Sequence, residues 1–509
     1  MSDWSSGYVT TTEYIFSYCR ELNPLRCRLP LLYAGYQPPE IRHACELGFG
    51  QGLGTAIHAA GSVVDWWATD FHPAHAGFAQ QLVAAFDGSA RMFDQSFEEF
   101  CSRSDLPEFD FIGLHGVWSW ISEENRRLII DFVRQRLRVG GMLYLSYNTQ
   151  PGWAARIPLR HLIDEHARVM SPPGNSMLDR VRDAFAFAEQ LVEVKPAYMS
   201  ANPQLTEQFH WIKQANAHYL AHEFFNRDWE CFSFSRIAAS LNAAKLHFAG
   251  SANPLDHLDG LLLTDEQQRF LEKIPDPVYQ QTVRDFVLNQ QFRQDYWIKG
   301  ARRLSERQRH EALRQQRVML HIDRDRVHLV NNVSPGEIAI DPEQFAPILD
   351  CLIDHRPKTI AELEAELESE GLGFCQLLSG ILALMSKNIL VPVQEDSLIG
   401  RVKPQTGGLN RFLLEMSQDS DNIVHLASPV TSGGVVVPRI QQRFLLAMTQ
   451  GEGSPEALAD RVWTKLDPGE RNRLSQGHGE LKEAGLAKLL DQARQFVTQL
   501  PRLRALGIV

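Results

Sequence analysis

Five short apolar segments alternate with amphipathic ones between residues 40 and 150, and this alternation limits the possible fold more than any other feature of the chain. Strands that alternate with helices form a parallel sheet, because each helix carries the chain back across the sheet. The sequence therefore predicts an α/β fold for this region. The expected strands are RHACEL, SVVDWWATD, ARMFD, EFDFIGLHG and GGMLYLSYN.

The helix before the last of these strands is the most clearly marked. Ser122 suits its N-cap, and the acids Glu123 and Glu124 suit its first turn. Apolar residues at helical spacing then form a buried stripe. We expect Gly140 and Gly141 to end the helix.

Four glycines follow the first expected strand, in the stretch CELGFGQGLGTA. Glycine has no side chain, so such a run lets the backbone approach a ligand closely. The dinucleotide pattern G-x-G-x-x-G fails in both registers, since its third glycine position holds leucine or threonine. The phosphate-loop pattern also fails, because no Gly-Lys-Ser/Thr occurs here. The loop therefore predicts a different ligand.

Acidic residues end three successive expected strands. Glu46 would repel a pyrophosphate but suits an amine and a positive centre. Asp70 lies 20 residues after Gly50, where Rossmann-like folds bind ribose hydroxyls, and Asp94 could accept from an adenine amino group. S-adenosylmethionine carries all of these groups, so we predict it as the cofactor. Its expected contacts are Glu46, Gly48, Gly50, Gly52, Asp70, Phe71, Asp94 and Gln95.

Three motifs carry a family resemblance. ELGFGQG resembles the first motif of class I methyltransferases, acidic-x-G-x-G-x-G. FDFIGLHGVWSWIS and LRVGGMLYLSYNTQPGW are similar to a bacterial family with a methyltransferase domain, a methyltransferase regulatory domain and a C-terminal winged-helix region. Its best-known members are lysine methyltransferases acting on outer-membrane proteins. The resemblance continues through HYLAHEFFNRDWECFSFSRIAASL and FVLNQQFRQDYWIKG, although Phe49 stands where the family commonly has cysteine.

The rest of the chain has a different residue pattern. After residue 155 the strand pattern stops, and the family resemblance places HYLAHEFFN in a helical region that packs over the active site. Two later helix-rich stretches resemble winged helices, which contact DNA in some proteins and other proteins elsewhere. We predict a Rossmann-like class I methyltransferase domain over residues 1–155 with an N-terminal extension, a mostly helical regulatory domain over 156–317, and a winged-helix-like region over 318–509.

Methyl transfer is an in-line displacement that requires alignment and a lone pair on the nucleophile. A lysine must first lose a proton from an amine of pKa near 10.4, and an apolar channel favours the neutral form. Aromatic faces can hold an alkyl-ammonium or a sulfonium, although tryptophans here could equally be packing residues. Likewise, His115 could simply bond a backbone carbonyl. We expect catalytic roles for His115, Trp118 and Tyr147, and substrate contacts from Trp120, Asn148 and Trp153.

Composition narrows the classes of function. A net charge of −11 and a pI near 5.9 argue against a general nucleic-acid binder. The chain shows neither a signal pattern nor an apolar run near the roughly 18 residues of a membrane helix. Seven cysteines without a CxxC pair predict reduced thiols and a cytoplasmic location. The histidine pairs 72/75 and 218/222 lack a third ligand at a familiar spacing, so no metal is expected.

Three functions remain open. The leading one is a protein N-methyltransferase acting on lysine, whose extra domains select the substrate and could also form a homodimer. The second is a small-molecule methyltransferase, which an enclosed pocket would favour, whereas a long groove would favour a protein acceptor. The third is a non-catalytic S-adenosylmethionine sensor that binds DNA, which a basic face on residues 318–509 would favour.

Overall fold

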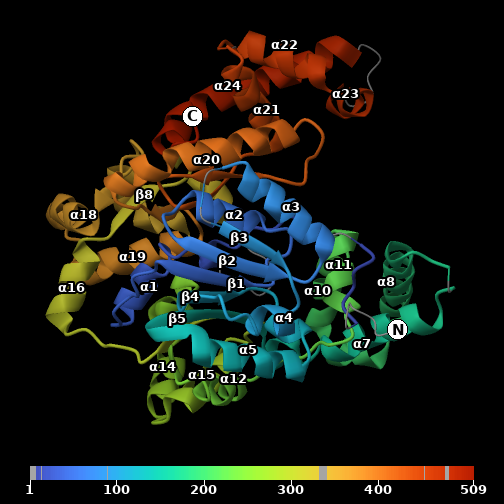
Figure 1. Ribbon diagram of the computed structural model, residues 1–509, viewed down its shortest axis with the longest axis vertical. Helices are drawn as coiled ribbons and strands as arrows, with labels where there is room; N and C mark the ends of the chain where they lie inside the picture. The colour runs from blue at the N-terminus through green and yellow to red at the C-terminus, as the bar shows by residue number, and fades with distance from the viewer. Residues whose placement is uncertain are drawn as a thin grey trace.

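The alternating pattern of residues 40–150 folds as a parallel sheet at the centre of the protein (Figure 1). Five neighbouring strands run parallel in the order β3-β2-β1-β4-β5, and all five expected strands are confirmed. They are β1 His43–Leu47, β2 Asp65–Asp70, β3 Ala90–Asp94, β4 Phe109–Leu114 and β5 Leu137–Asn148. The computed structural model describes residues 7–12, 14–86, 88, 90–172, 174–331, 341–451, 453–475 and 481–509.

The expectation that strands stop after residue 155 is wrong. β6 (Leu246–Ser251) and β7 (Phe292–Lys299) complete a seven-stranded sheet, in which β7 is antiparallel to both β5 and β6. Arg293 and Asp295 interrupt the apolar pattern of β7, which obscured it in the sequence. Both side chains are buried and pair with each other at 2.9 Å. This pairing lets the charged strand lie inside the sheet, between β5 and β6.

The helix between β4 and β5 begins as predicted but ends earlier. α5 spans Glu123–Arg136, and the Ser122 side chain accepts from the backbone N–H of Asn125. β5 starts at the next residue, so the predicted stop at Gly140 and Gly141 is wrong. The pairing register between β4 and β5 shifts at this point, which places the two glycines in an irregular stretch of the strand.

Each face of the sheet has its own hydrophobic core. Because strand side chains alternate between faces, Tyr144 of β5 belongs to one core and Tyr147 to the other. Figure 1 shows helices above and below the strands. Helices that contact the strands include α2 Leu53–Ala60, α3 Pro73–Ala84 and α12 Phe234–Asn242. α4 Phe97–Cys101 packs against α5, α15 Pro277–Val287 against α12, and α14 Asp265–Glu272 against α15.

A helical block lies to one side of the sheet (Figure 1). It has a core of its own, into which Val9 of the N-terminal segment also packs. The N-terminal segment, residues 7–12 and 14–22, therefore ties this block to the sheet. The helices of the block are α7 Ile157–Val169, α8 Met177–Glu193, α9 Ala197–Ala201, α10 Pro203–Ile212 and α11 Ala217–Phe224.

The C-terminal part adds to the core on the Tyr144 face of the sheet. It forms two helix-rich units. The first contains a three-stranded sheet of β8 (Arg317–Leu320), β9 (Lys358–Thr359) and β10 (Leu390–Pro392), and the second a ribbon of β11 (His425–Ser428) and β12 (Gly433–Val436). Their likeness to winged helices stays a prediction, and residues 476–480 of the second stretch lie outside the described residues. The helices are α16 Glu306–Arg314, α17 Ala346–Cys351, α18 Ile360–Leu367, α19 Phe374–Ser386, α20 Asp396–Met416, α21 Arg439–Thr449, α22 Pro455–Lys465, α23 Pro468–Ser475 and α24 Leu481–Ala505.

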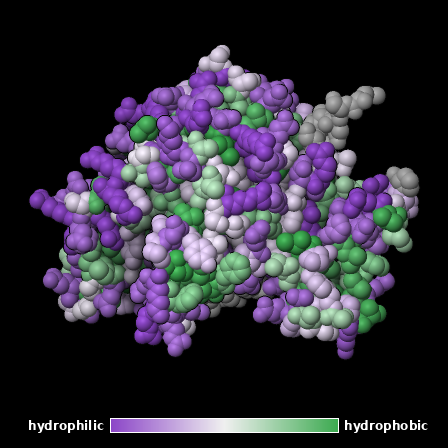
Figure 2. All heavy atoms as spheres, turned by 90° about the horizontal axis from the view of Figure 1, so that it is seen from below, coloured by the Kyte–Doolittle hydropathy of each residue, from purple (hydrophilic) through white to green (hydrophobic). Residues whose placement is uncertain are grey.

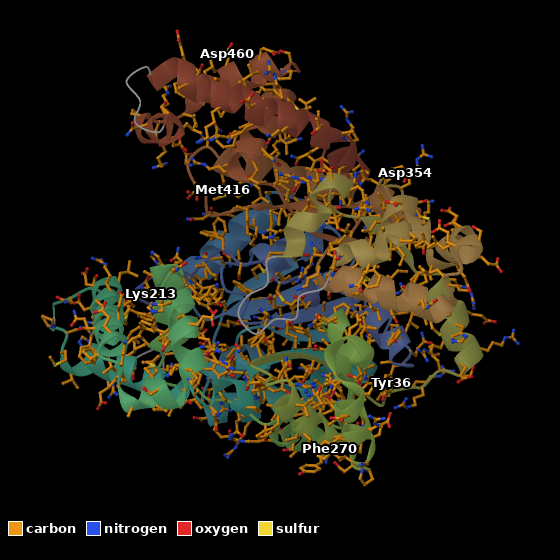
Figure 3. All side chains as sticks on the ribbon, turned by 180° about the vertical axis from the view of Figure 1, so that it is seen from behind. Tyr36, Lys213, Phe270, Asp354, Met416 and Asp460 are labelled. Carbon is orange, nitrogen blue, oxygen red and sulfur yellow. The ribbon has the colours of Figure 1, made fainter. Side chains whose placement is uncertain are left out.

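The face shown in Figure 2 is mainly polar, with several apolar patches. Exposed apolar side chains include Phe270 on α14, Phe286 on α15 and Trp211 on α10. Figure 3 shows Phe270 at one extremity of the molecule and Lys213, just after α10, on the helical block. Over the described residues, no single helix is long and apolar enough to cross a membrane; one pair, Ile360–Glu370 with Phe374–Ser386, passes that test only jointly and is bent by 118°.

Candidate functional site

A cavity of about 630 Å³ opens at the carboxyl ends of β1, β2 and β4. This is the edge where open α/β sheets bind ligands. The N-terminal segment and Asp228 contribute to its walls. Eight of the predicted site residues line it: Glu46, Gly48, Gly50, Asp70, Phe71, Gln95, His115 and Trp120.

The glycine loop bends sharply between β1 and α2. Gly48 has φ +82° and Gly52 has φ +74°, a region that side-chain-bearing residues rarely adopt. A Cβ on Gly48 would lie 2.6 Å from Val117 Cγ2, and one on Gly52 would lie 2.4 Å from the Cβ of Ala79. Gly52 does not line the cavity, so its predicted cofactor contact is replaced by close packing between α2 and α3.

Asp70 holds this loop from the end of β2. One carboxylate oxygen accepts from the backbone N–H of Gly50 at 2.9 Å, and the other accepts from that of His72 at 3.0 Å. The Nδ1 atom of His75 lies 3.4 Å from the latter oxygen. The side chain of Asp70 is nevertheless part of the cavity wall, so it can brace the loop and face a ligand together.

Glu46 places a second carboxylate in the same cavity. It is only 5% exposed, and its one hydrogen-bond donor among the described residues is the hydroxyl of Thr55 at 2.5 Å. Burial raises the pKa of Glu46 to about 7; the charge of Asp70 also raises it, while the Thr55 hydrogen bond opposes the shift. A cationic ligand group would favour the ionised form, because it would replace the lost solvation.

His115 follows β4 and is held by a side chain instead of a backbone carbonyl. Its Nδ1 atom lies 2.8 Å from the hydroxyl of Tyr144, which also accepts from Gln294 at 3.1 Å. Burial lowers the pKa of His115, so the imidazole is neutral near pH 7. A neutral ring with a fixed orientation in the cavity wall can accept a proton.

Five further predicted residues lie outside the cavity lining. Tyr147 faces the other side of the sheet and donates to Asp295 at 2.8 Å. Strand alternation explains this, since Tyr144 and Tyr147 are three positions apart and so point to opposite faces. The other four are Trp118, buried in the core on that same face; Asp94, which is exposed; Asn148, which is buried and whose N–H donates to Ser119; and Trp153, which packs edge-on against Trp229.

Sequence reasoning missed the residues that cover the cavity. Tyr8 and Tyr14 line it and pack against His222. The ring centroid of His222 lies 5.4 Å from that of Tyr8 and 5.0 Å from that of Tyr14. The HYLAHEFFN stretch therefore reaches the site, although indirectly through the tyrosines. Burial raises the pKa of its Glu223 to about 7 against the opposing charges of nearby arginines. No strand pattern marks the tyrosines, so their position depends entirely on the tertiary fold.

Fold and site together define a class I methyltransferase fold. PKMT2 from Rickettsia typhi in complex with AdoHcy matches with a TM-score of 0.69, covering 96% of this chain and 98% of that chain at 16% identity. A second structure of PKMT2 matches with a TM-score of 0.68, covering 97% and 99% at the same identity. At this identity the match shows the fold, in which the C-terminal units are included.

Sequence comparison then gives the family. The family described as predicted methyltransferase regulatory domain matches residues 216–299, which run from α11 to the end of β7. The chain is 34% identical over 512 residues to uncharacterized protein sll1526 of Synechocystis sp., with 99% of each covered. It is also 25% identical over 205 residues to uncharacterized protein RP789 of Rickettsia prowazekii, which is 38% of this chain and 35% of that one. The chain belongs to the family of the Synechocystis protein, with a class I methyltransferase fold and a methyltransferase regulatory domain.

Proposed function

We propose that this protein is an S-adenosylmethionine-dependent methyltransferase that modifies lysine side chains of a protein substrate. The observation that carries the proposal is the pair Glu46 and Asp70, two buried carboxylates on either side of a glycine loop in one cavity. Among the described residues, the cavity lining contains no Lys or Arg to bind a phosphate. Two carboxylates suit a ligand with an ammonium, a sulfonium and ribose hydroxyls. The match to PKMT2 in complex with AdoHcy supports the same ligand class.

Residues of this chain fit that cofactor. Glu46 would take the amino group, Asp70 the ribose hydroxyls, and Gln95 would lie toward the adenine. When bound, the cofactor supplies an electrophilic methyl group on sulfur. Asp70 already accepts the Gly50 N–H, so the loop is held in place before binding, which lowers the entropic cost of association.

The acceptor side of the proposal depends on His115 and the tyrosines. Tyr8, Tyr14 and Trp120 offer aromatic faces to an alkyl-ammonium. His115 is neutral and can take the proton that the ammonium loses before attack. The lone pair of the neutral nitrogen would then be free to accept the methyl group that the bound cofactor supplies, and the electron pair of the broken carbon–sulfur bond would stay on sulfur. Positioning supplies much of the rate.

The proposed division of labour follows the predicted domains. Residues 1–155 would bind the cofactor and residues 156–317 would cover the site and select the acceptor. Residues 318–509 would contact partner proteins, and the whole would act in the cytoplasm. The covering role is supported by Asp228, which lines the cavity, and by His222, which packs against Tyr8 and Tyr14.

A labelled-methyl assay tests the proposal. Purified protein and methyl-tritiated S-adenosylmethionine are incubated with a lysate of source cells, and macromolecular and small-molecule fractions are counted. We expect label on lysine in protein bands, lost with Asp70→Ala and retained with Asp94→Ala. Label confined to small molecules would instead establish a biosynthetic methyltransferase. Binding of the cofactor without transfer to either fraction would favour the sensor function.

A further inference from the structure

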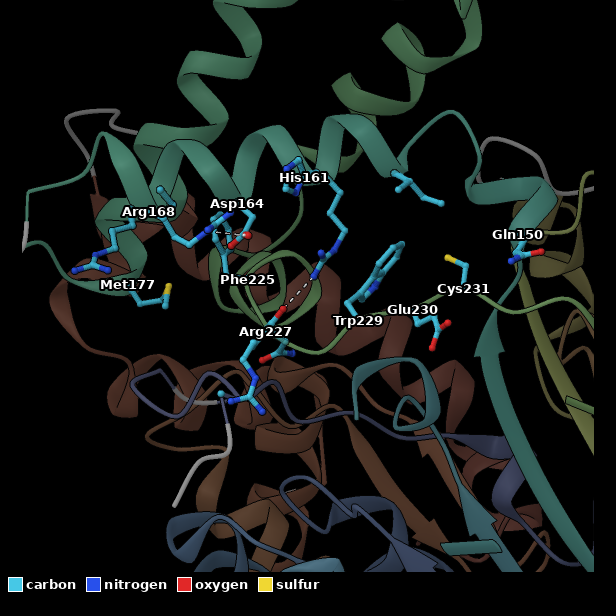
Figure 4. A pocket seen from close by; sticks show the side chains of 16 residues that line it. Gln150, His161, Asp164, Arg168, Met177, Phe225, Arg227, Trp229, Glu230 and Cys231 are labelled. Carbon is cyan, nitrogen blue, oxygen red and sulfur yellow. Dashed lines mark hydrogen bonds and ion pairs between the residues drawn. The ribbon is translucent and has the colours of Figure 1, made fainter. Parts of the chain in front are cut away.

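A second cavity, of about 770 Å³, lies between the helical block and the segment that joins it to β6 (Figure 4). In this view His161, Asp164 and Arg168 of α7 form one wall, and Arg227, Trp229 and Glu230 form the other. We call this cavity the basic groove. It has no role in the chemistry described above.

The walls of the basic groove carry more positive than negative charge. Four arginines line it, against Asp164 and Glu230. Both acids are already neutralised: Asp164 pairs with Arg168 at 3.2 Å, and Glu230 pairs with Arg126 and Arg236, which lie outside the groove lining. Arg227 pairs in turn with Asp228 at 2.9 Å, so the four lining arginines keep a small excess of positive charge over these three acids.

Arg160 is the most deeply buried of the four arginines, and the charges of Glu223 and Asp164 act on it from nearby. It is 8% exposed and lies over the ring of Trp229, 4.3 Å from the centroid. Its guanidinium donates to backbone carbonyls of Glu223 and Asn226, and among the described residues no carboxylate lies within ion-pair distance of it. Burial lowers the pKa of Arg160 to about 10, which a bound carboxylate would reverse.

The basic groove and the cofactor cavity share a wall. Gly7 lines both. Arg227 and Trp229 face the groove, whereas Asp228 between them faces the cofactor cavity. The side chain of Asp228 also pairs with that of Arg227 at 2.9 Å, so this short segment is a wall that the two spaces share. A chain held in the groove would pass directly beside the methyl-transfer site.

We propose that the basic groove binds an acidic segment of the acceptor protein and so presents an adjacent lysine to the cofactor cavity; this rests on the proposed function. A peptide fits better than a nucleic acid. Ile157, Met177 and Phe225 form apolar parts of the lining, which a peptide can match with apolar side chains between its acids. A phosphate backbone offers uniform charge and no apolar groups to match these three side chains.

Peptide binding at equilibrium tests this without requiring catalysis. The probes are two fluorescein-labelled lysine peptides, one with glutamate and alanine around the lysine, and one with glutamine in place of every glutamate. Their affinities for the full-length protein are measured by fluorescence anisotropy. The variants are Arg168→Glu and Arg227→Glu, whose side chains are 60% and 64% exposed. The matched control is Arg182→Glu on α8, which is 73% exposed and absent from the groove lining.

We expect each groove variant to weaken binding of the acidic peptide about tenfold, while Arg182→Glu leaves it unchanged. The glutamine peptide should bind the wild type about tenfold less tightly and be insensitive to all three substitutions. Equal binding of both peptides, no binding of either, or preferred binding of a labelled single-stranded DNA would each overturn the inference. S-adenosylmethionine affinity is measured in parallel: its absence defeats the proposed function, whereas its retention with groove-independent peptide binding defeats only the docking site.

Discussion

The carboxylate of Asp70 accepts the backbone N–H of Gly50 at 2.9 Å, so the end of one strand fixes the loop that follows another. The two residues are 20 positions apart in the chain, and parallel pairing of β1 with β2 brings them together. The Asp70 carboxylate that the cofactor would contact is therefore also the group that holds the glycine loop.

Asp70→Ala should weaken S-adenosylmethionine binding about 10- to 100-fold, because it removes both a ligand contact and the brace on the loop. Isothermal titration calorimetry measures this directly. Asp94→Ala is the matched control, since Asp94 is the register partner of Asp70 at the same sheet edge but lies outside the cavity lining. Its affinity should stay within about twofold of wild type. Equal losses in both variants would refute the assignment of Asp70.

Cofactor affinity should depend on the ionisation of Glu46, whose pKa burial raises to about 7. Below that pH the carboxyl is neutral, so affinity should fall about tenfold for each pH unit. Glu46→Gln should bind weakly at every pH from 5.5 to 8 on this account. A wild-type affinity that is flat across that range would contradict the role.

The same shift makes Glu46 a cost to stability at high pH. A folded-state pKa above the unfolded value means that stability is lost as pH rises from about 4.5 through about 7. Glu46→Gln should therefore raise the free energy of unfolding by roughly 2 to 3 kcal/mol at pH 8 and by little at pH 4.5. Urea titrations at the two pH values check this. A variant that is equally or less stable at pH 8 would show that the buried charge is well solvated.

Tyr144 should act as a positioning residue for His115. Tyr144→Phe removes the hydroxyl at 2.8 Å from the ring, so kcat should fall about tenfold or more, with S-adenosylmethionine affinity unchanged and the acid limb of the kcat–pH profile displaced. Tyr147→Phe is the comparison. It loses a hydrogen bond to buried Asp295, so it should lower the free energy of unfolding by about 1.5 to 3 kcal/mol and leave kcat intact. The reverse pattern would restore Tyr147 as the catalytic candidate.

The glycines of the loop should differ in their tolerance of a methyl group. Gly52→Ala meets both a left-handed backbone and the Cβ of Ala79 at 2.4 Å, so it should cost about 2 kcal/mol or more. Gly54 lies in α2, where the nearest atom to an added Cβ is 4.0 Å away. Gly54→Ala should be neutral or stabilising by up to about 1 kcal/mol. Chemical denaturation distinguishes them, and similar costs at both positions would exclude the packing account.

How far the sequence leads is clear from β5 and β7. The five strands of residues 40–150 follow from apolar runs separated by helices, because local burial imposes that pattern. β7 looks like a surface strand in the sequence because it carries Arg293 and Asp295, which pair with each other and with Asp285 and Tyr147 inside the fold. Tyr144 and Tyr147 both lie near the end of β5, and only the alternation of the strand decides that Tyr144 is the one beside His115.

The sequence by itself determined the parallel strands of residues 40–150, the glycine loop and the carboxylates Glu46 and Asp70. Spacing along single strands fixes where these fall. Tertiary structure alone decided what covers them. Tyr8, Tyr14 and Asp228 come from segments far apart in the chain, and the basic groove arises where α7 faces residues 225–231. Such contacts depend on how separate elements pack, which no local period encodes.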